Sequence, residues 1–389
     1  MSDLLNQYRL IRAASESICR NLAAEDYVVQ PVVDVSPPKW HLAHTSWFFE
    51  TFILSPHSSG YQVFHPAWGY LFNSYYETVG ERVPRADRGN LSRPTVDEVY
   101  AYRSYVDDAM AQFLERNELS PELEALVVLG LNHEQQHQEL LITDIKYILG
   151  HNPLYPSLEV PELRSAQAVA SELTEQWAAV GGGVYSVGVP ASHKGFSFDN
   201  ERSAHKQYIE DFEIRRSLVT KREYLAFIED GGYQEFDLWH SDGWSWVQET
   251  NAVAPLYWQK LDNEWMTYDF NGLCPVQPDL PVVHVNFYEA SAFAAWKGCR
   301  LPTESEWEVA SHKIQWGERW EWTNSAYLPY PGFSTASGAV GEYNGKFMVN
   351  QMVLRGSSVA TPEGHSRKTY RNFFQPWLQW QYMGIRLVR

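Results

Sequence analysis

Apolar residues recur at intervals of three and four positions through four segments of the first 150 residues, and this spacing predicts helices. The predicted helices cover residues 4–24, 40–54, 95–116 and 120–149. Residues 56–94, between the second and third helices, are irregular and rich in aromatic residues, glycine and proline, and connections of that length are usually functional. Four long helices with one extended crossover predict a four-helix bundle over residues 1–150.

The fourth predicted helix has the clearest boundary signals. Ser120 is suited to be its N-cap, and Pro121 can take the first helical position, where a missing N–H costs nothing. Gly150 follows the last apolar residue and can end the helix. We therefore expect one continuous helix from Ser120 to Leu149.

The second half of the chain has a different pattern. Residues 151–178 have weak periodicity and several prolines, which indicates a linker. From 179 to 389, short strand-like runs alternate with long segments rich in glycine and tryptophan, and one helix is expected near Tyr288–Lys297. The predicted fold is a helical bundle followed by a mixed α/β domain.

His133 and His137 lie four positions apart on the apolar stripe of the fourth helix, so their imidazoles point the same way from successive turns. Two histidines at this spacing can share one metal ion. A pair of hydrogen-bonded core histidines would give the same pattern. A third histidine in a matching position therefore decides how the pair is interpreted.

The second predicted helix supplies His41 and His44, either of which could face the core. His44 continues one stripe with Phe48 and Phe52, which makes it the better candidate for the inward position. Three neutral imidazoles leave a divalent ion with its full charge and with open coordination positions. This ligand set suits zinc as well as iron. Hydrolytic zinc chemistry would need a general base, and Glu134 is a weak candidate because it lies off the His133 and His137 face.

Composition narrows the class of protein. A chain of 389 residues with 44% hydrophobic residues fits two globular domains, and a net charge of −17 argues against nucleic acid or an anionic membrane surface as a partner. No apolar run approaches membrane-spanning length, the first residues lack a signal-peptide core, and three widely spaced cysteines form no disulfide framework. We expect a cytoplasmic protein. The 16 tryptophans and 23 tyrosines suit a pocket for a cationic or planar ligand, or simply an aromatic core.

Motifs in both halves resemble one family. In the first half, Trp40–His44, Leu71–Gly80 and Asn132–Leu141 resemble the DinB-like domain of ergothioneine-biosynthesis sulfoxide synthases of the EgtB type. In the second half, Pro281–Ala290, Arg300–Glu308 and Trp320–Thr323 are similar to the formylglycine-generating-enzyme (sulfatase-modifying factor) fold, a C-type-lectin-like domain. The resemblance covers nearly the whole chain, in the family's domain order.

The resemblance implies a mononuclear non-haem Fe(II) enzyme with O₂ as co-substrate. Such an enzyme joins a thiol sulfur to the imidazole C2 of hercynine and oxidises that sulfur to a sulfoxide. The implied iron ligands are His44, His133 and His137, and Gln136 matches the glutamine that orients the substrate imidazole.

The crossover segment is expected to supply catalytic and donor-binding residues. Tyr75 and Tyr76 resemble the catalytic tyrosines of the family branch that uses free cysteine, and a phenol can donate a proton at neutral pH. Of the two we favour Tyr76. Arginines in the same segment suit the carboxylate of a sulfur donor, with Arg85 as first choice and Arg88 as second.

The C-terminal stretch 367–380 resembles the segment that closes over hercynine, whose trimethylammonium group suits aromatic faces. Departures from the family pattern, at Gln375, Gln379 and Arg319 among others, leave the donor open between cysteine, γ-glutamylcysteine and the selenosugar of selenoneine synthases. Other hypotheses are a DinB-type metal-dependent thiol transferase and a lectin-like binding module with a structural metal. The candidate hercynine-binding residues in this stretch are Asn372, Phe373, Phe374, Trp377 and Trp380.

Overall fold

The computed structural model describes residues 3–76, 80–116, 118–173, 175–335 and 344–389, which form two compact units. The first unit comprises Met1–Leu163, Phe270–Gly272 and Ala360–His365, and the second comprises Arg164–Asp269, Leu273–Val359 and Ser366–Arg389. The segment predicted as a linker is thus divided between the units. Among the described residues, no helix combines the length and apolar character that crossing a membrane requires.

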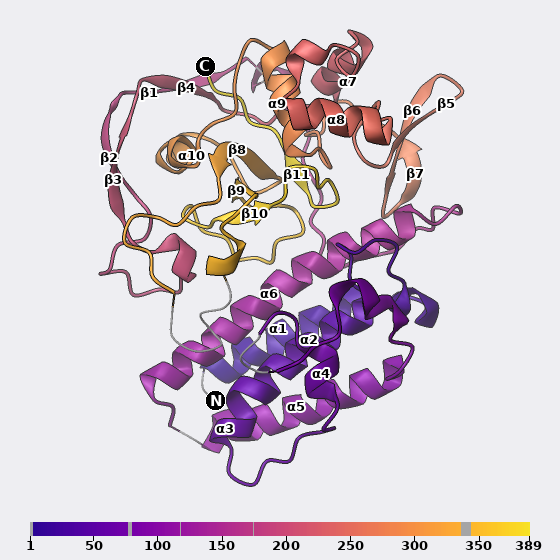
Figure 1. Ribbon diagram of the computed structural model, residues 1–389, viewed down its shortest axis with the longest axis vertical. Coiled ribbons are helices and arrows are strands. Elements are labelled where there is room, and N and C mark those ends of the chain that lie inside the picture. The colour runs from indigo at the N-terminus through magenta and orange to yellow at the C-terminus, as the bar shows by residue number, and fades with distance from the viewer. Residues whose placement is uncertain (1–2, 77–79, 117, 174, 336–343) are drawn as a thin grey trace. The chain divides into compact units, whose positions relative to one another are not determined.

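The first unit is helical, as the periodicity predicts (Figure 1). Its long helices are α1 (Asp3–Cys19), α2 (Pro38–Phe49), α5 (Val96–Arg116) and α6 (Pro121–Gly150). A π-helical turn η2 (Glu50–Leu54) and α3 (Ser55–His57) continue α2 directly. The crossover between α3 and α5 contains two short helices that periodicity did not reveal. These are α4 (Trp68–Phe72) and the 3₁₀ turn η3 (Arg85–Asn90). A further 3₁₀ turn, η1 (Ala24–Val28), follows α1.

The ends of α6 follow the boundary signals closely. The side chain of Ser120 accepts a hydrogen bond from the backbone N of Leu123 (3.3 Å), so the predicted N-cap is confirmed. At the other end, Gly150 is itself the last helical residue, and His151 takes the cap position with its N–H directed to Tyr147 O. The predicted end is therefore one residue early, which is the usual uncertainty of a helix boundary.

Helices α2 and α6 approach each other closely at Gly130. A Cβ atom on this residue would lie 2.8 Å from Cε1 of Phe49 and 2.9 Å from Cε1 of Phe48. Both distances are shorter than carbon atoms tolerate, so only glycine lets the two helices come this near. Because His133 follows Gly130 by one turn, the same contact brings that histidine against α2.

A buried ion network joins α1, α5 and α6 on another side of the bundle. Glu134 accepts hydrogen bonds from Arg12 Nη1 (2.8 Å), Arg103 Nη2 (3.1 Å) and Ser15 Oγ (2.7 Å). Burial alone would raise the pKa of Glu134, but the two guanidinium groups lower it below its ordinary value. Glu134 therefore stays ionised and is fully engaged in structure, which leaves it unsuited to be a general base.

The second unit combines small sheets with short helices, as predicted in kind (Figure 1). Its largest sheet has the order β10-β9-β8-β11, with β8 (Trp320–Ala326), β9 (Met352–Gly356) and β10 (Asn372–Phe374) antiparallel and β11 (Met383–Gly384) parallel to β8. The smaller sheets are β1 (Trp177–Val180) with β4 (Phe212–Arg215), β2 (Gly183–Val187) with β3 (His205–Ile209), and β5 (Trp258–Leu261) with β6 (Glu264–Asp269) and β7 (Gly272–Pro275).

The helices of the second unit are α7 (Lys221–Glu229), α8 (Ser241–Thr250), α9 (Phe287–Trp296) and α10 (Glu304–Ala310). Only α9 was predicted, near Tyr288–Lys297. Buried ion pairs connect the elements of this unit. Arg371, just before β10, pairs with Glu304 on α10 (Nε to Oε2, 2.8 Å). Arg386 donates two hydrogen bonds to Glu321 on β8 (2.5 and 2.7 Å). Trp307, Trp320 and Trp322 are fully buried, so much of the aromatic content is core packing.

We predict that Glu134→Gln destabilises the folded protein by about 1.5–3 kcal/mol, because it removes the buried charge that Arg12 and Arg103 share and leaves them only Asp107 and Glu16 as carboxylate partners. The free energy of unfolding from urea titration, measured without added metal, tests this value. Glu115→Gln is the matched control: Glu115 pairs with Arg9 at 3.4 Å with both side chains 49% exposed, and its loss should cost under about 1 kcal/mol. Equal effects of the two substitutions would contradict the structural role of Glu134.

Candidate metal centre

Three histidines from two helices meet inside the first unit. His44 on α2 and His133 and His137 on α6 each offer one ring nitrogen, and these atoms all lie within 4.8 Å of one another. Their relative exposures are 0%, 2% and 9%. The structure thus brings together the three residues that the sequence singles out as ligands.

All three imidazoles are held neutral. Burial lowers the pKa of His133 to about 4 and lowers the pKa values of His44 and His137 well below the ordinary value. The proximity of His133 lowers the other two further. Neutral imidazole is the form that binds a metal, so the cluster is ready for a cation at neutral pH.

The tautomer of His44 is fixed by the crossover segment. Its Nδ1 donates to the backbone carbonyl of Phe72 (2.6 Å), which leaves Nε2 with a lone pair. That Nε2 is buried and has no hydrogen-bond partner among the described residues. The ring is also stacked between Trp40 (4.6 Å, 11°) and Trp47 (5.4 Å, 17°). A buried, unpartnered acceptor costs about 1–3 kcal/mol, and a metal ion in this position would remove that cost.

His137 makes a different kind of outer contact. Its Nδ1 lies 2.8 Å from Nδ1 of His41, whose Nε2 lies 2.9 Å from Oδ2 of Asp144. His41 is therefore buried beside the cluster rather than in it, which agrees with the preference for His44 as the ligand. Sequence reasoning gave Asp144 no role, although it lies two helical turns from His137 and therefore on nearly the same face of α6.

The donor set fits a divalent transition metal. Three imidazole nitrogens on one side leave further coordination positions for other ligands, as in catalytic rather than structural sites. Zinc, iron and other first-row ions all accept this set, so the geometry supports a metal centre without choosing the ion.

The two tyrosines of the crossover lie beside the cluster. Tyr76 is buried, with its ring 5.6 Å from Trp47 and 5.2 Å from Phe52, and the half-buried Tyr75 stacks on it at 4.7 Å. Asn73 fixes this turn: its Oδ1 accepts from Tyr76 N, and its Nδ2 donates to Tyr76 O, both at 3.1 Å. One indole ring, that of Trp47, thus separates Tyr76 from His44.

The two candidate arginines occupy different environments. Arg85 is exposed and donates to the backbone carbonyl of Asp34, whereas Arg88 is buried with its guanidinium 3.4 Å above the ring of Trp40. Arg88 donates to Ser36 Oγ (2.9 Å) and Ser74 Oγ (3.3 Å), and none of the described carboxylates forms an ion pair with it. Burial, and then the charge of Arg85, lowers the pKa of Arg88, and the negative charge of Asp144 offsets this only in part.

Gln136 is half-buried on α6, in the position just before His137. The remaining candidates belong to the second unit. Asn372, Phe373 and Phe374 form β10, where Phe373 stacks on Tyr327 (4.0 Å, 9°). Phe374 contacts Trp380 edge-on (5.4 Å); Trp380 is buried, whereas Trp377 is 48% exposed.

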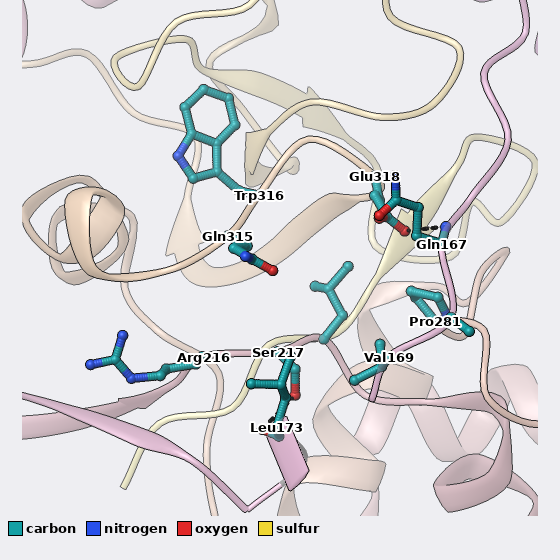
Figure 2. A pocket seen from close by; sticks show the side chains of 11 residues that line it. Gln167, Val169, Leu173, Arg216, Ser217, Pro281, Gln315, Trp316 and Glu318 are labelled. Carbon is teal, nitrogen blue, oxygen red and sulfur yellow. Dashed lines mark hydrogen bonds between the residues drawn. The ribbon is translucent and has the colours of Figure 1, made fainter. Parts of the chain in front are cut away.

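The second unit also contains a cavity of about 110 Å³, and Figure 2 shows the side chains around it. Trp316 and Arg216 lie on its wall, and Glu318 accepts a hydrogen bond from the backbone N of Gln167 (3.2 Å). None of the predicted site residues lines this cavity, so it does not bear on the candidate chemistry.

Comparison with known proteins gives two family matches and several relatives. Residues 7–141 match the DinB superfamily, and residues 164–318 match the sulfatase-modifying factor enzyme 1-like domain. The chain is 30% identical over 409 residues to a hercynine oxygenase of Mycolicibacterium smegmatis, covering 91% of each chain. It is 28% identical over 405 residues to a hercynine oxygenase of Mycobacterium tuberculosis, again covering 91% of each chain. It is 24% identical over 275 residues to ergothioneine biosynthesis protein 1 of Schizosaccharomyces pombe, covering 60% of this chain and 33% of that protein.

We predict that His137→Ala abolishes stoichiometric binding of Fe(II), because two remaining imidazoles hold a divalent ion poorly, while the bundle stays folded. Metal content after anaerobic loading, together with far-ultraviolet circular dichroism, measures both parts. His151→Ala, an exposed histidine just beyond the same helix, is the control and should retain one metal per chain. Unchanged metal content in His137→Ala would rule out the assigned ligand set.

Proposed function

Because the chain belongs to the hercynine oxygenase family, we propose that it is an O₂-dependent sulfoxide synthase of ergothioneine biosynthesis. In this reaction a C–S bond forms between the imidazole C2 of hercynine and the sulfur of a thiol, and the sulfur is oxidised to a sulfoxide. The observation that carries the proposal is the buried three-histidine cluster within a chain similar to these relatives over 91% of its length. We also expect the enzyme to act in the cytoplasm, on small-molecule substrates.

We propose Fe(II) as the metal held by His44, His133 and His137. A redox-active ion with open positions supplies the binding and reduction of O₂, which zinc, having no accessible redox change, does not. The protein's contribution is to hold three neutral ligands on one side and to leave the other side to the substrates. Three protein ligands with open positions favour an oxygenase over a closed structural site, which normally has four protein ligands.

Arg88 is our candidate for binding the carboxylate of the thiol donor. It is a buried guanidinium without an ion pair among the described residues, and its Nε has no hydrogen-bond acceptor there. The indole N–H groups of Trp40 and Trp47, which flank His44, are likewise buried without an acceptor in the described chain. Buried donors of this kind favour a ligand that is rich in oxygen and negatively charged. The exposed Arg85, our first choice from the sequence, has no comparable setting and becomes the second choice.

Hercynine carries an imidazole and a trimethylammonium group. We propose that Gln136, next to His137, orients the imidazole by hydrogen bonding. The cation would rest on aromatic faces of the C-terminal stretch, where Phe374, Trp377 and Trp380 are the better candidates because Tyr327 already covers one face of Phe373. Asn372 is proposed as a polar contact on the same strand.

We propose Tyr76 as the group that delivers a proton during oxygen reduction. A bound thiolate and O₂ can lead to the sulfoxide or, by simple dioxygenation of the thiol, to a sulfinic acid. A phenol supplies a proton at neutral pH. Because Tyr76 is buried, bulk water does not compete with it as a proton source. Tyr75, stacked on Tyr76, is the alternative.

A second function, metal-dependent thiol transfer without O₂, follows from the DinB match alone. The ion pairs of Glu134 with Arg12 and Arg103 argue separately against hydrolytic zinc chemistry, for which Glu134 was the candidate general base. A selenosugar donor remains an alternative for the first function. Product analysis by mass spectrometry with hercynine, Fe(II), O₂ and a panel of thiol and selenol donors tests all three hypotheses. Turnover under strict exclusion of O₂ would contradict our proposal.

We predict that Tyr76→Phe slows sulfoxide formation by about 10²-fold or more and raises the share of sulfinic acid, because only the proton-donating hydroxyl is removed. Metal content and hercynine affinity should stay near the parent values. Rates and product ratios are measured by liquid chromatography and mass spectrometry. Tyr75→Phe is the control, and a parental rate and ratio in Tyr76→Phe would assign Tyr76 to packing alone.

We predict that Arg88→Met raises the KM for the thiol donor about 10-fold or more, since a charge-assisted contact to a carboxylate is lost. The KM for hercynine should change little. Steady-state kinetics with each substrate varied separately gives both constants. Arg85→Met serves as the comparison, and a larger effect on the donor KM in that variant would restore Arg85 as the carboxylate ligand.

A further inference from the structure

A chain of hydrogen bonds runs from a buried carboxylate to one of the three candidate ligands. Oδ2 of Asp144 lies 2.9 Å from Nε2 of His41, and Nδ1 of His41 lies 2.8 Å from Nδ1 of His137. The same Asp144 oxygen accepts a hydrogen bond from the backbone N of Ser36 (2.8 Å), which anchors it just before α2. Asp144, His41 and His137 are 1%, 2% and 9% exposed, so the whole chain is shielded from solvent.

The chemistry of these groups allows one arrangement of hydrogens once His137 binds a metal through Nε2. Its Nδ1 then bears the hydrogen, so the facing Nδ1 of His41 has to accept it. A neutral His41 consequently bears its own hydrogen on Nε2, where the Asp144 carboxylate accepts it. Both short contacts are satisfied in this arrangement. The reverse direction would place the single hydrogen of His137 on Nε2, the atom that binds the metal, and would turn a lone pair of His41 toward the Asp144 carboxylate.

We propose that Asp144 and His41 are positioning residues for the metal centre, which hold the ring of His137 in place and make it a stronger ligand than His44. This inference rests on the three-histidine centre proposed above. Contacts of this outer kind fix the tautomer and orientation of a metal-bound imidazole and increase its basicity. Here an imidazole lies between the carboxylate and the ligand.

The outer hydrogen-bond partner of His44 differs from that of His137. Its outer acceptor is the neutral backbone carbonyl of Phe72, which fixes the tautomer but carries no charge. His137 is instead connected to a full negative charge through His41. The two ligands therefore differ in outer support although they lie within 4.8 Å of one another.

The test uses Co(II) alone as the probe, so it does not depend on turnover. His41→Phe keeps an aromatic ring but removes both hydrogen bonds, and it should raise the Kd for Co(II) about 10–100-fold. His41→Gln can accept from His137 and donate to Asp144 through its amide, so it should recover most of the affinity. Asp144→Asn keeps the size and an acceptor but removes the charge, and a smaller increase in Kd is expected. Gln138→Met, which removes the hydrogen bonds from Gln138 Nε2 to Ile11 O (2.7 Å) and Ser15 Oγ (3.1 Å) next to His137 in sequence, is the matched control and should bind Co(II) like the parent.

Proton NMR of the Co(II) protein supplies a readout that a merely structural role would not change. Exchangeable, strongly shifted signals are expected from the Nδ1–H groups of His44 and His137. In His41→Phe the His137 signal should move or disappear through exchange, while the His44 signal stays in place. Isothermal titration and these spectra are taken on the same full-length samples.

The outcomes separate the two proposals. Parental Kd values and unchanged spectra in His41→Phe and Asp144→Asn, with metal lost only in His137→Ala, would overturn the positioning role and leave the centre intact. Metal retained in His137→Ala would overturn the centre itself. If His41→Phe does not fold, the near-isosteric Asp144→Asn and the His41→Gln variant decide the matter through the same measurements.

Discussion

The contact of α2 with α6 at Gly130 is the constraint on which the candidate centre depends. A side chain at position 130 would collide with the rings of Phe48 and Phe49, so it would push α2 and α6 apart beside His133. Here the rings of Phe48 and Phe49 lie directly against the Gly130 backbone, so His44 and His133 come within ligand distance. The ligand geometry is therefore set by packing, before any metal is bound.

Glu134 and Asp144 are both buried acidic residues of α6, but their side chains have different partners. Glu134 faces Arg12 and Arg103 and fastens α6 to its neighbours. Asp144 instead faces the imidazole of His41 and the backbone N of Ser36. Its charge is directed toward the metal ligands, where a bound cation compensates it. Glu134 therefore supports the fold, whereas Asp144 can influence the metal ligands through His41.

Periodicity was sufficient for the long helices and for placing His133 and His137 on one face of α6, because both signals extend over several turns. The short helices α7, α8 and α10 were missed because seven to ten residues rarely establish a period. The start signals of α7 and α10 were present, since Thr220 with Glu223 and Thr303 with Glu306 form capping boxes. The ranking of Arg85 over Arg88 could not be decided from the sequence. Both arginines lie in one irregular segment, and only the fold reveals which of them is buried on Trp40.

Charge explains why a site of this kind would select its donor. Three neutral imidazoles add no negative charge to a bound +2 ion, and the guanidinium of Arg88 adds a further buried positive charge nearby, so Asp144 alone offsets only part of the total. Burying that much positive charge is costly unless anions accompany it. A donor with a thiolate for the metal and a carboxylate for Arg88 would neutralise both positions at once. A neutral thiol without a carboxylate would leave Arg88 without an ion pair, so affinity for the donor should follow its negative charge more than its size.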